Sequence, residues 1–298
     1  MPNPYIKSPQ CTTMKERELI TEIVKLLNIA NEDAFVFSFN NTLFSLTVDT
    51  LVAKTDVPEG MTNFQIGWKT AVMNLSDLAA MGSTPQYFLC SLTLPQEYPA
   101  LEIIKGVQSA CKTCQCTFSG GDLNEGALSA SGFALGTSKT VMLRSGAKPG
   151  DRVGITGDVG RVYAGLKDLT TATQSMKEKI FSPQPCIKKG VVLNAHSCID
   201  ISDGLSSELH HIAEASSVQI DIHADKIPIH PDVKKKAQSV GEDPVTWALK
   251  SGEEYELVFT DRYIDPVKGI DIGEVRKGKG VLLDGNVMPW LGWEHYTQ

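Results

Sequence analysis

The sequence predicts a protein of the α/β (α+β) class with two domains. Strand-like and helix-like patterns alternate along the whole chain, as they do in proteins that combine sheets with helices. At 298 residues the chain is too long for one typical core and suits two domains of about 150 residues each. A turn-rich segment at 145–151 divides the pattern, so we expect an N-terminal domain over 1–145 and a C-terminal domain over 146–298.

The first half is expected to centre on one buried helix over 62–80. This segment is apolar on almost every side, Thr62 and Gln65 form a capping-box pattern at its start, and Asp77 lies in its last turns. Apolar repeats at helical spacing predict further helices, and β-rich runs predict strands. These are helix 15–27, strands 35–39, 43–51 and 86–94, helix 100–113 and strand 128–137.

The second half continues the alternation, with short apolar runs between amphipathic segments. Its interleaved elements favour a second α/β layer structure. The expected strands are 152–156, 218–223, 255–260 and 281–283, and the expected helices are 162–169, 186–195 and 205–215.

Composition and charge exclude several classes of function. A net charge of −7 and a pI near 5.4 argue against a nucleic-acid partner, because no basic stripe is present. No apolar run approaches the roughly 20 residues of a membrane span. The first residues show no signal-peptide pattern, and seven irregularly spaced cysteines suggest reduced thiols. We therefore expect a cytoplasmic protein with no nucleic-acid or membrane partner.

Several aspartates stand in short apolar or glycine-rich frames, where a carboxylate is poorly solvated. They are Asp49, Asp77, Asp122, Asp200 and Asp203. Acids brought together by folding repel one another unless protons or cations bridge them. Carboxylates that share Mg²⁺ with substrate phosphates are typical of nucleotide enzymes, so the set predicts a Mg²⁺–phosphate enzyme. Taken singly, Asp122 could be a turn residue after Gly-Gly, and Asp203 could cap the following helix.

Other phosphate-binding motifs fit poorly. Residues 273–280 nearly match a P-loop, but Gly280 replaces the hydroxyl residue and a strand rather than a helix is expected next. Gly154, Gly157 and Gly160 do not make the GxGxxG pattern of a dinucleotide site. We therefore interpret residues 273–280 as a charged surface turn and expect no dinucleotide site at 154–160.

The CxxCxC pattern of Cys111, Cys114 and Cys116 could suggest a metal site. A structural zinc site needs a second ligand pair, and none stands at a recognisable spacing. We interpret these residues as small apolar thiols that lead into a buried strand. His210 and His211 are neighbours on a helix and should point apart, which argues against a shared ion.

Together the frames resemble the thiamine-monophosphate kinase family over residues from about 30 to 295. The matching segments occur in the family's order and at compatible spacing. They are Asp49-Thr50-Leu51-Val52-Ala53, residues 74–82, Gly120-Gly121-Asp122, residues 144–151, residues 200–205, residues 251–257 and, near the end, residues 290–295.

The resemblance implies the two-domain fold of aminoimidazole ribonucleotide synthetase and a homodimer formed through the N-terminal domains. It also implies ATP-dependent phosphorylation of thiamine monophosphate to thiamine diphosphate, by direct transfer assisted by several Mg²⁺ ions and without a catalytic acid or base. The implied metal-binding residues are Asp33, Thr47, Asp49, Thr50, Asp77, Asp122, Asp200 and Asp203. The implied ATP contacts are Gly121, Asp122, Arg144 and Ser202, and the implied substrate contacts are Asp56, Glu253 and Trp290.

The chain departs from the family pattern at three places. The family's Gly-Asp-Asp is Asn31-Glu32-Asp33 here, Val48 stands where Thr is usual, and Asp56 stands where many members carry a substrate-facing His. Two alternatives remain open: another ATP-dependent reaction on the same scaffold, or a non-catalytic nucleotide-binding dimer. Related synthetases and maturation proteins on this scaffold need a reactive cysteine or an Asp-Gly-Val-Gly-Thr-Lys segment that the chain lacks.

Overall fold

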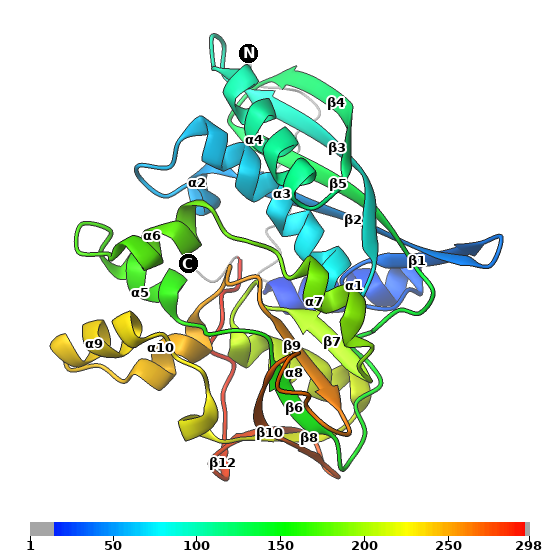
Figure 1. Cartoon of the computed structure of the whole chain (residues 1–298), viewed down its shortest axis with the longest axis vertical. Coiled ribbons are helices and arrows are strands. Elements are labelled where there is room, and N and C mark those ends of the chain that lie inside the picture. The colour runs from blue at the N-terminus through cyan, green and yellow to red at the C-terminus, as the bar shows by residue number, and fades with distance from the viewer. Residues whose placement is uncertain (1–14, 296–298) are drawn as a thin grey trace. The chain divides into compact units, whose positions relative to one another are not determined.

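The computed structural model describes residues 15–295 of the chain, and residues 1–14 and 296–298 lie outside this range (Figure 1). The chain forms two compact units. Among the described residues, the smaller one comprises 15–31 with 293–295, and the larger one comprises 32–292. Within the smaller unit, helix α1 (Glu16–Leu27) confirms the predicted first helix, and Arg17 pairs with Glu294 at 3.3 Å.

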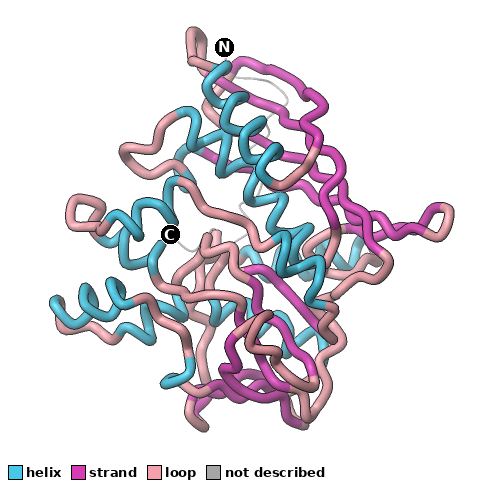
Figure 2. The backbone as a smooth tube through the Cα atoms, viewed as in Figure 1, coloured by secondary structure: helices cyan, strands magenta, loops and turns pink. Residues whose placement is uncertain are grey.

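The larger unit begins with a five-stranded sheet in the order β1-β2-β5-β3-β4 (Figure 2). All neighbours in this sheet are antiparallel except β3 and β4, which run parallel. Helices α3 and α4 pack on each other beside the sheet, and their buried residues form one core with those of the strands. The strands are β1 (Phe35–Phe39), β2 (Thr42–Val52), β3 (Thr84–Leu94), β4 (Thr117–Glu125) and β5 (Ser129–Ser138), and the helices are α2 (Ala53–Asp56), α3 (Asn63–Ala80) and α4 (Ala100–Thr113).

Helix α3 confirms the prediction of a buried helix that starts with a capping box. The Thr62 side chain accepts from Gln65 N, and the Gln65 side chain accepts from Thr62 N. Two glycines let α4 approach α3 closely, since a Cβ at Gly67 would lie 1.8 Å from the Ile103 carbonyl oxygen, and one at Gly106 would lie 1.9 Å from that of Phe64. The C-terminal part of α3 also contacts strand β7 and helix α7 of the second half. Side chains at this end of α3 can therefore contact residues of both sheets.

A seven-stranded sheet follows, in the order β12-β11-β8-β10-β6-β9-β7. Its core is a second cluster that includes Trp247, Ile199 and Val258. The strands are β6 (Arg152–Ile155), β7 (Ser197–Asp200), β8 (Gln219–Ile222), β9 (Leu257–Asp261), β10 (Ile270–Arg276), β11 (Gly280–Leu283) and β12 (Asn286–Val287). The helices are α5 (Arg161–Lys167), α6 (Gln174–Phe181), α7 (Ile187–Leu193), α8 (Leu205–Ser216), the 3₁₀ turn η1 (Ala224–Lys226), α9 (Pro231–Ser239) and α10 (Pro244–Lys250).

The α/β class with two sheets is confirmed, and the strands of the first sheet all precede residue 145 whereas those of the second all follow it. Because both sheets lie in one compact unit, their division into two domains at 145–146 stays a prediction. The near-P-loop at 273–280 was expected to be a surface turn, but residues 273–276 belong to strand β10 and Gly280 begins β11, so only 277–279 connect the two strands. Among the described residues, no helix is long and apolar enough to cross a bilayer.

One interpretation was wrong: the strand that follows the cysteines is not buried. β4 is an edge strand of its sheet, and its last seven residues, 119–125, are all exposed. Its Ser-Gly-Gly-Asp sequence has no apolar alternation, so the sequence contains no local signal for this strand. The strand forms because β3 supplies a parallel partner.

Candidate active site

Three of the predicted acids meet in the interior of the larger unit. Asp33 precedes β1, Asp77 lies near the end of α3, and Asp200 ends β7, yet each offers a carboxylate oxygen within 4.8 Å of the others. Burial, and after it the charge of Asp33, raise the pKa of Asp200 to about 8. Burial, together with the charges of Asp200, Asp49 and Asp33, raises the pKa of Asp77 well above its ordinary value. The cluster therefore needs protons or a cation to be stable at neutral pH.

Arg144 neutralises one side of this cluster. Its Nη2 and Nε donate to the same Asp33 oxygen, Oδ1, at 2.6 and 3.1 Å. The other oxygen, Asp33 Oδ2, is buried and has no hydrogen-bond partner among the described residues. Burial raises the pKa of Asp33 whereas Arg144 lowers it. A buried acceptor without a donor is costly, and a cation beside it would remove that cost.

Helix α3 positions the acids with three polar side chains in its last turns. Ser76 Oγ donates to Asp200 Oδ2 at 2.6 Å, and Asn74 Oδ1 accepts from the Asp49 main chain at 2.8 Å. The Asp77 carboxylate accepts from Thr47 Oγ1 at 2.5 Å. The predicted residues Thr47 and Asp49 therefore lie next to the three clustered acids. No role was predicted from the sequence for Asn74 and Ser76, although both stand in the same segment, 74–82, as Asp77.

The loop after β7 carries the predicted residues Ser202 and Asp203. The Asp203 N–H donates to Glu208 Oε1 at 2.9 Å, and burial raises the pKa of Glu208 well above its ordinary value, as do the charges of Asp203 and Asp200. Ser202 is exposed, and its carbonyl accepts from Glu253 N at 2.7 Å. The loop is thus held by a buried glutamate on one side and by segment 251–253 on the other.

Thr50 and Asp122 lie in a row across the five-stranded sheet rather than in the acid cluster. The register pairs Thr50 with Ser131, Ser131 with Ser91, and Ser91 with Asp122. Thr50 and Asp122 are both exposed. Within a single chain Thr50 and Asp122 therefore do not join the acid cluster, and their assignment as metal-binding residues stays a prediction.

Gly121, next to Asp122, is required by the backbone of the sheet. A Cβ at this position would lie 1.6 Å from the Cys90 carbonyl oxygen of β3. Gly120 before it has a φ of +110°, which glycine adopts without strain. The Gly-Gly pair thus lets β4 run beside β3 and fixes where Asp122 stands.

The three predicted substrate contacts already have protein partners. Glu253 lies 2.5 Å from the buried Lys69 ammonium, and Asp56 Oδ2 accepts from Val52 N at 2.6 Å. The Trp290 ring stacks on His210, with 4.6 Å between centroids and 12° between planes, and meets His211 edge-on. The two histidines share this ring, an arrangement that the sequence did not predict.

Lys69 was also missed. It is 1% exposed and lies on α3, a largely buried and mostly apolar helix. A lysine in such a helix is itself a signal, because an ammonium is buried only where it has a partner.

Comparison with known proteins places the chain in a family. Residues 31–138 match the family described as AIR synthase related protein, N-terminal domain. Thiamine-monophosphate kinase from Pyrococcus abyssi is 39% identical, over 95% of this chain and 96% of its own length. The chain belongs to the thiamine-monophosphate kinase family. The family's enzyme from Methanospirillum hungatei is 30% identical, over 95% of this chain and the whole of its own length.

Solved structures agree with this membership of the thiamine-monophosphate kinase family. AaThiL complexed with AMPPCP and TMP has a TM-score of 0.89 and 29% identity, and covers 94% of this chain and 97% of its own. Thiamine monophosphate kinase from Aquifex aeolicus has a TM-score of 0.83, 29% identity and coverages of 92% and 99%. The hydrogenase maturation protein HypE in complex with ATP, at 16% identity, a TM-score of 0.69 and coverages of 85% and 86%, shows the shared fold alone.

Proposed function

We propose that this protein transfers a phosphoryl group from ATP to thiamine monophosphate and so makes thiamine diphosphate. The observation that carries this proposal is the cluster of Asp33, Asp77 and Asp200, in which Asp33 and Asp200 are buried and Asp77 is partly buried. The cluster lies beside α3, which contacts strands of both sheets. It stands in a chain of the thiamine-monophosphate kinase family whose fold matches that of AaThiL complexed with AMPPCP and TMP.

The chemistry of the three acids fits Mg²⁺. Their oxygens are hard ligands, they are close enough to share an ion, and Asp33 Oδ2 has no other partner among the described residues. Asp33, Asp77 and Asp200 would hold the ion, with Thr47 and Asp49 beside them. When bound, Mg²⁺ supplies positive charge that offsets the repulsion between the phosphates of ATP and of the substrate. Further ions, at Asp203, Asp122 and Thr50, remain part of the proposal.

The protein's own residues need only bind and orient the two substrates. A phosphomonoester oxygen is already a nucleophile at pH 7, so no general base is required and no side chain must take a proton. Arg144 would lie near the nucleotide phosphates while its guanidinium keeps Asp33 in place. Gly121 and Ser202 are the other proposed ATP contacts.

Thiamine monophosphate combines a cationic thiazolium with an aminopyrimidine and a phosphate. Glu253 would accept a hydrogen bond or lie near the positive charge, which requires it to share its carboxylate with Lys69. The Trp290 ring would attract the cation through its π face, with the stack on His210 fixing the orientation of the ring. Asp56 would contribute a further negative charge near Glu253, since the Asp56 carbonyl accepts from the same Lys69 ammonium at 2.8 Å.

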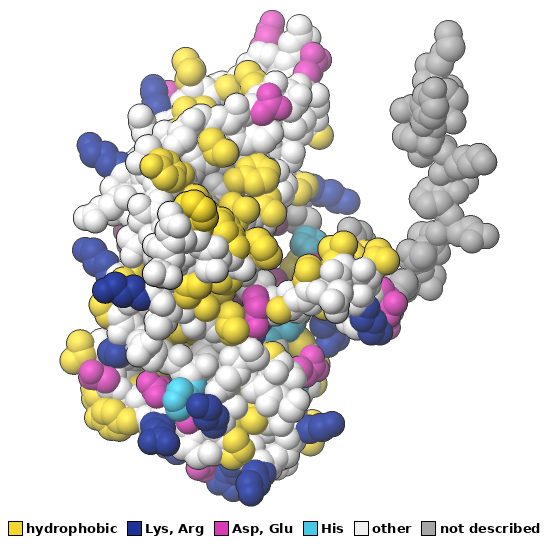
Figure 3. Space-filling view, turned by 90° about the vertical axis from the view of Figure 1, so that its right-hand side faces the viewer, with side chains coloured by type: hydrophobic (Ala, Val, Ile, Leu, Met, Phe, Trp, Pro, Cys, Tyr) yellow, Lys and Arg dark blue, Asp and Glu magenta, His cyan; other side chains and the backbone are white. Residues whose placement is uncertain are grey.

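The proposed homodimer is supported by the exposed face of the five-stranded sheet. Large apolar side chains gather there, and Figure 3 shows hydrophobic side chains grouped on the side of the molecule that carries these strands. Contiguous apolar surface of this kind usually marks an interface, and closed two-fold dimers are the commonest assembly. The exposed residues are Phe35, Phe37, Phe39, Leu46, Val48, Tyr87, Leu89 and Phe133.

A second copy of the chain is the occupant that best explains this face. Thr50 lies on this face, and the strand register places Asp122 in the same cross-strand row. A partner would therefore cover polar residues that do not belong to the acid cluster. Sedimentation of the purified protein should show a dimer. Leu89→Asp should give monomers, whereas Leu101→Asp, an exposed leucine on α4, should not. A monomeric wild type would contradict the proposal.

We also propose a cytoplasmic location. The six cysteines of the described residues are all free thiols, which suits a reducing compartment that also supplies ATP.

One assay separates the proposed reaction from the two alternatives. Pure protein is incubated with Mg-ATP and thiamine monophosphate, and thiamine diphosphate is detected by mass. Formation of ADP and thiamine diphosphate in equal amounts supports the kinase. ATP turnover only with a different acceptor would indicate another reaction on this scaffold, and nucleotide binding without turnover would indicate a non-catalytic dimer.

A further inference from the structure

Residues 253–256 carry three glutamates that are held from two sides by buried lysines. Glu253 lies 2.5 Å from Lys69 of α3, and Glu256 lies 2.9 Å from Lys179 of α6. The second oxygen of Glu254 lies 3.9 Å from the same Lys179 ammonium. Both lysines are almost fully buried, at 1% and 9% exposure. Three acids within four residues would repel one another in such surroundings, so the lysines are needed to keep them together.

The backbone of this segment adopts a conformation that it would not choose alone. Glu253 and Tyr255 have φ values of +55° and +50°, in the left-handed region that residues other than glycine rarely occupy. Such backbone persists only where its surroundings fix it. Gly160 N and Val162 N, at the start of α5, donate to Glu254 Oε1 at 2.8 and 3.1 Å. The Glu254 side chain is therefore one anchor, that is, one fixed contact that holds the main chain of segment 253–256 in this conformation.

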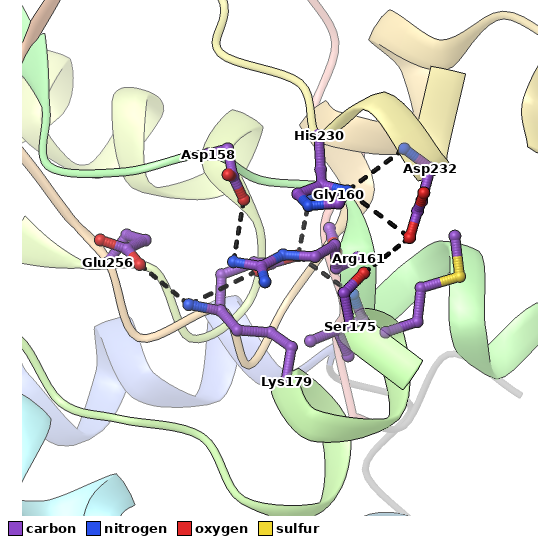
Figure 4. Close-up of polar contacts among 12 residues, drawn as sticks. Asp158, Gly160, Arg161, Ser175, Lys179, His230, Asp232 and Glu256 are labelled. Carbon is purple, nitrogen blue, oxygen red and sulfur yellow. Dashed lines mark hydrogen bonds and ion pairs between the residues drawn. The ribbon is translucent and has the colours of Figure 1, made fainter. Parts of the chain in front are cut away.

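Glu256 is the second anchor and the strongest partner of Lys179. Its carboxylate also accepts from Thr156 Oγ1 at 2.8 Å and from Cys186 Sγ at 3.2 Å. Burial opposes ionisation of Glu256, but Lys179 and these hydrogen bonds outweigh it and lower its pKa. Figure 4 shows Lys179 reaching toward Glu256 from its helix, with the contact drawn as a dashed line.

The helix that carries Lys179 is itself fixed at its start. Thr173 caps α6 and donates to the Asp232 carboxylate of α9 at 2.6 Å. Ser175 donates to the same carboxylate at 2.7 Å (Figure 4). Just after α6, the Pro183 carbonyl accepts from Trp68 Nε1 at 2.6 Å. Lys179 therefore lies on a helix whose two ends both contact other parts of the larger unit.

We propose that Lys179 is a positioning residue, which pairs with Glu254 and Glu256 and so holds segment 253–256 in the conformation that presents Glu253 to the substrate. This inference rests on the proposed function, in which Glu253 contacts thiamine monophosphate. Lys179 acts through the segment, because its ammonium contacts Glu256 and Glu254 rather than Glu253.

The test removes the charge and keeps the length of the side chain, with Lys179→Met. Lys177→Met on the same helix is the matched control, because Lys177 has no ion pair among the described residues. Amide hydrogen exchange of 251–256 should be faster in Lys179→Met and unchanged in Lys177→Met. The KM for thiamine monophosphate should rise about tenfold while the KM for ATP stays within about twofold, because only one substrate contacts the segment. Lys179→Arg, which restores the charge, should recover most of both properties.

Wild-type exchange rates at 251–256 in folded Lys179→Met would overturn the inference, as would equal increases of both KM values. If Lys179→Met does not fold, Glu256→Gln removes the partner charge and should raise exchange and KM in the same directions, and its failure to do so would also overturn the inference. A wild type that does not phosphorylate thiamine monophosphate would refute the proposed function. In that case the exchange measurement, which needs no reaction, still decides whether Lys179 holds the segment.

Discussion

Asp77→Asn tests the acid cluster at its centre. Asp77 shares the cluster with Asp33 and Asp200, and the three offer oxygens within 4.8 Å of one another. Asparagine has nearly the same shape and can still accept from Thr47 Oγ1, which now donates to Asp77 at 2.5 Å. The substitution therefore removes one negative charge and changes the packing very little.

Activity should fall steeply in this variant. Loss of one preorganised electrostatic contact in an active site typically costs about 2.7–4 kcal/mol, which corresponds to a kcat lower by roughly 10²–10³-fold. Steady-state formation of thiamine diphosphate at saturating ATP and thiamine monophosphate measures it. Raising the Mg²⁺ concentration should recover only part of the lost rate. The variant lacks one carboxylate ligand even when the ion is bound, so the loss is more than weaker affinity for Mg²⁺.

The stability of the metal-free protein, unlike its activity, should not fall in Asp77→Asn. The folded-state pKa of Asp200 is about 8, above the ordinary value of 3.8, so between these pH values the folded protein binds more protons than the unfolded chain. The free energy of unfolding of the metal-free protein should therefore fall as the pH rises from about 4 to about 8. Asp77→Asn removes part of the repulsion, so its metal-free stability at pH 8 should equal or exceed that of the wild type and fall less with pH.

Thermal melts in EDTA at several pH values, with and without added Mg²⁺, measure both effects. Asp225→Asn, a change at an exposed aspartate of η1, is the control and should leave the pH dependence as it is. Near-normal kcat in Asp77→Asn would refute the role of the cluster in the reaction. An unchanged or steeper pH dependence would refute the argument that these carboxylates repel one another.

Three further substitutions test the surroundings of the cluster. Trp290→Ala should raise the KM for thiamine monophosphate several-fold and leave the KM for ATP almost unchanged, since a cation–π contact contributes ~0.5–2 kcal/mol. Steady-state kinetics with each substrate varied in turn measures both KM values. Ser76→Ala removes the donor to Asp200 Oδ2 and should lower metal-free stability at pH 8 by about 1–3 kcal/mol, measured by urea unfolding. Gly132→Ala would place a Cβ 2.2 Å from the Asn74 amide nitrogen, so it should lower the melting temperature and cost ~1–3 kcal/mol, and an unchanged melt would show that the sheet can shift there.

Local patterns accounted for the four longest helices, α1, α3, α4 and α8, and for most strands, but α2, α6, α9 and α10 were not predicted. Helix α3 was predictable because its cap, its apolar surface and the glycine after it all lie within 21 residues of sequence, 62–82. β7 was missed because it has only four residues, all buried, which show no alternation. α9 was missed because its lysine-rich sequence shows little apolar periodicity, and its start depends on His230 and Pro231.

The sequence by itself determined the α/β class, the buried helix and the identity of the acids, because these depend on residue type and near neighbours. Only the tertiary structure decided which acids meet. Asp33, Asp77 and Asp200 come together because α3 lies between the two sheets, whereas Asp122 stands in a cross-strand row set by strand register. Register and helix placement depend on packing between residues far apart in the chain, and no local pattern encodes them. For the same reason the buried Lys69 and Lys179 became interpretable only when their glutamate partners were in place.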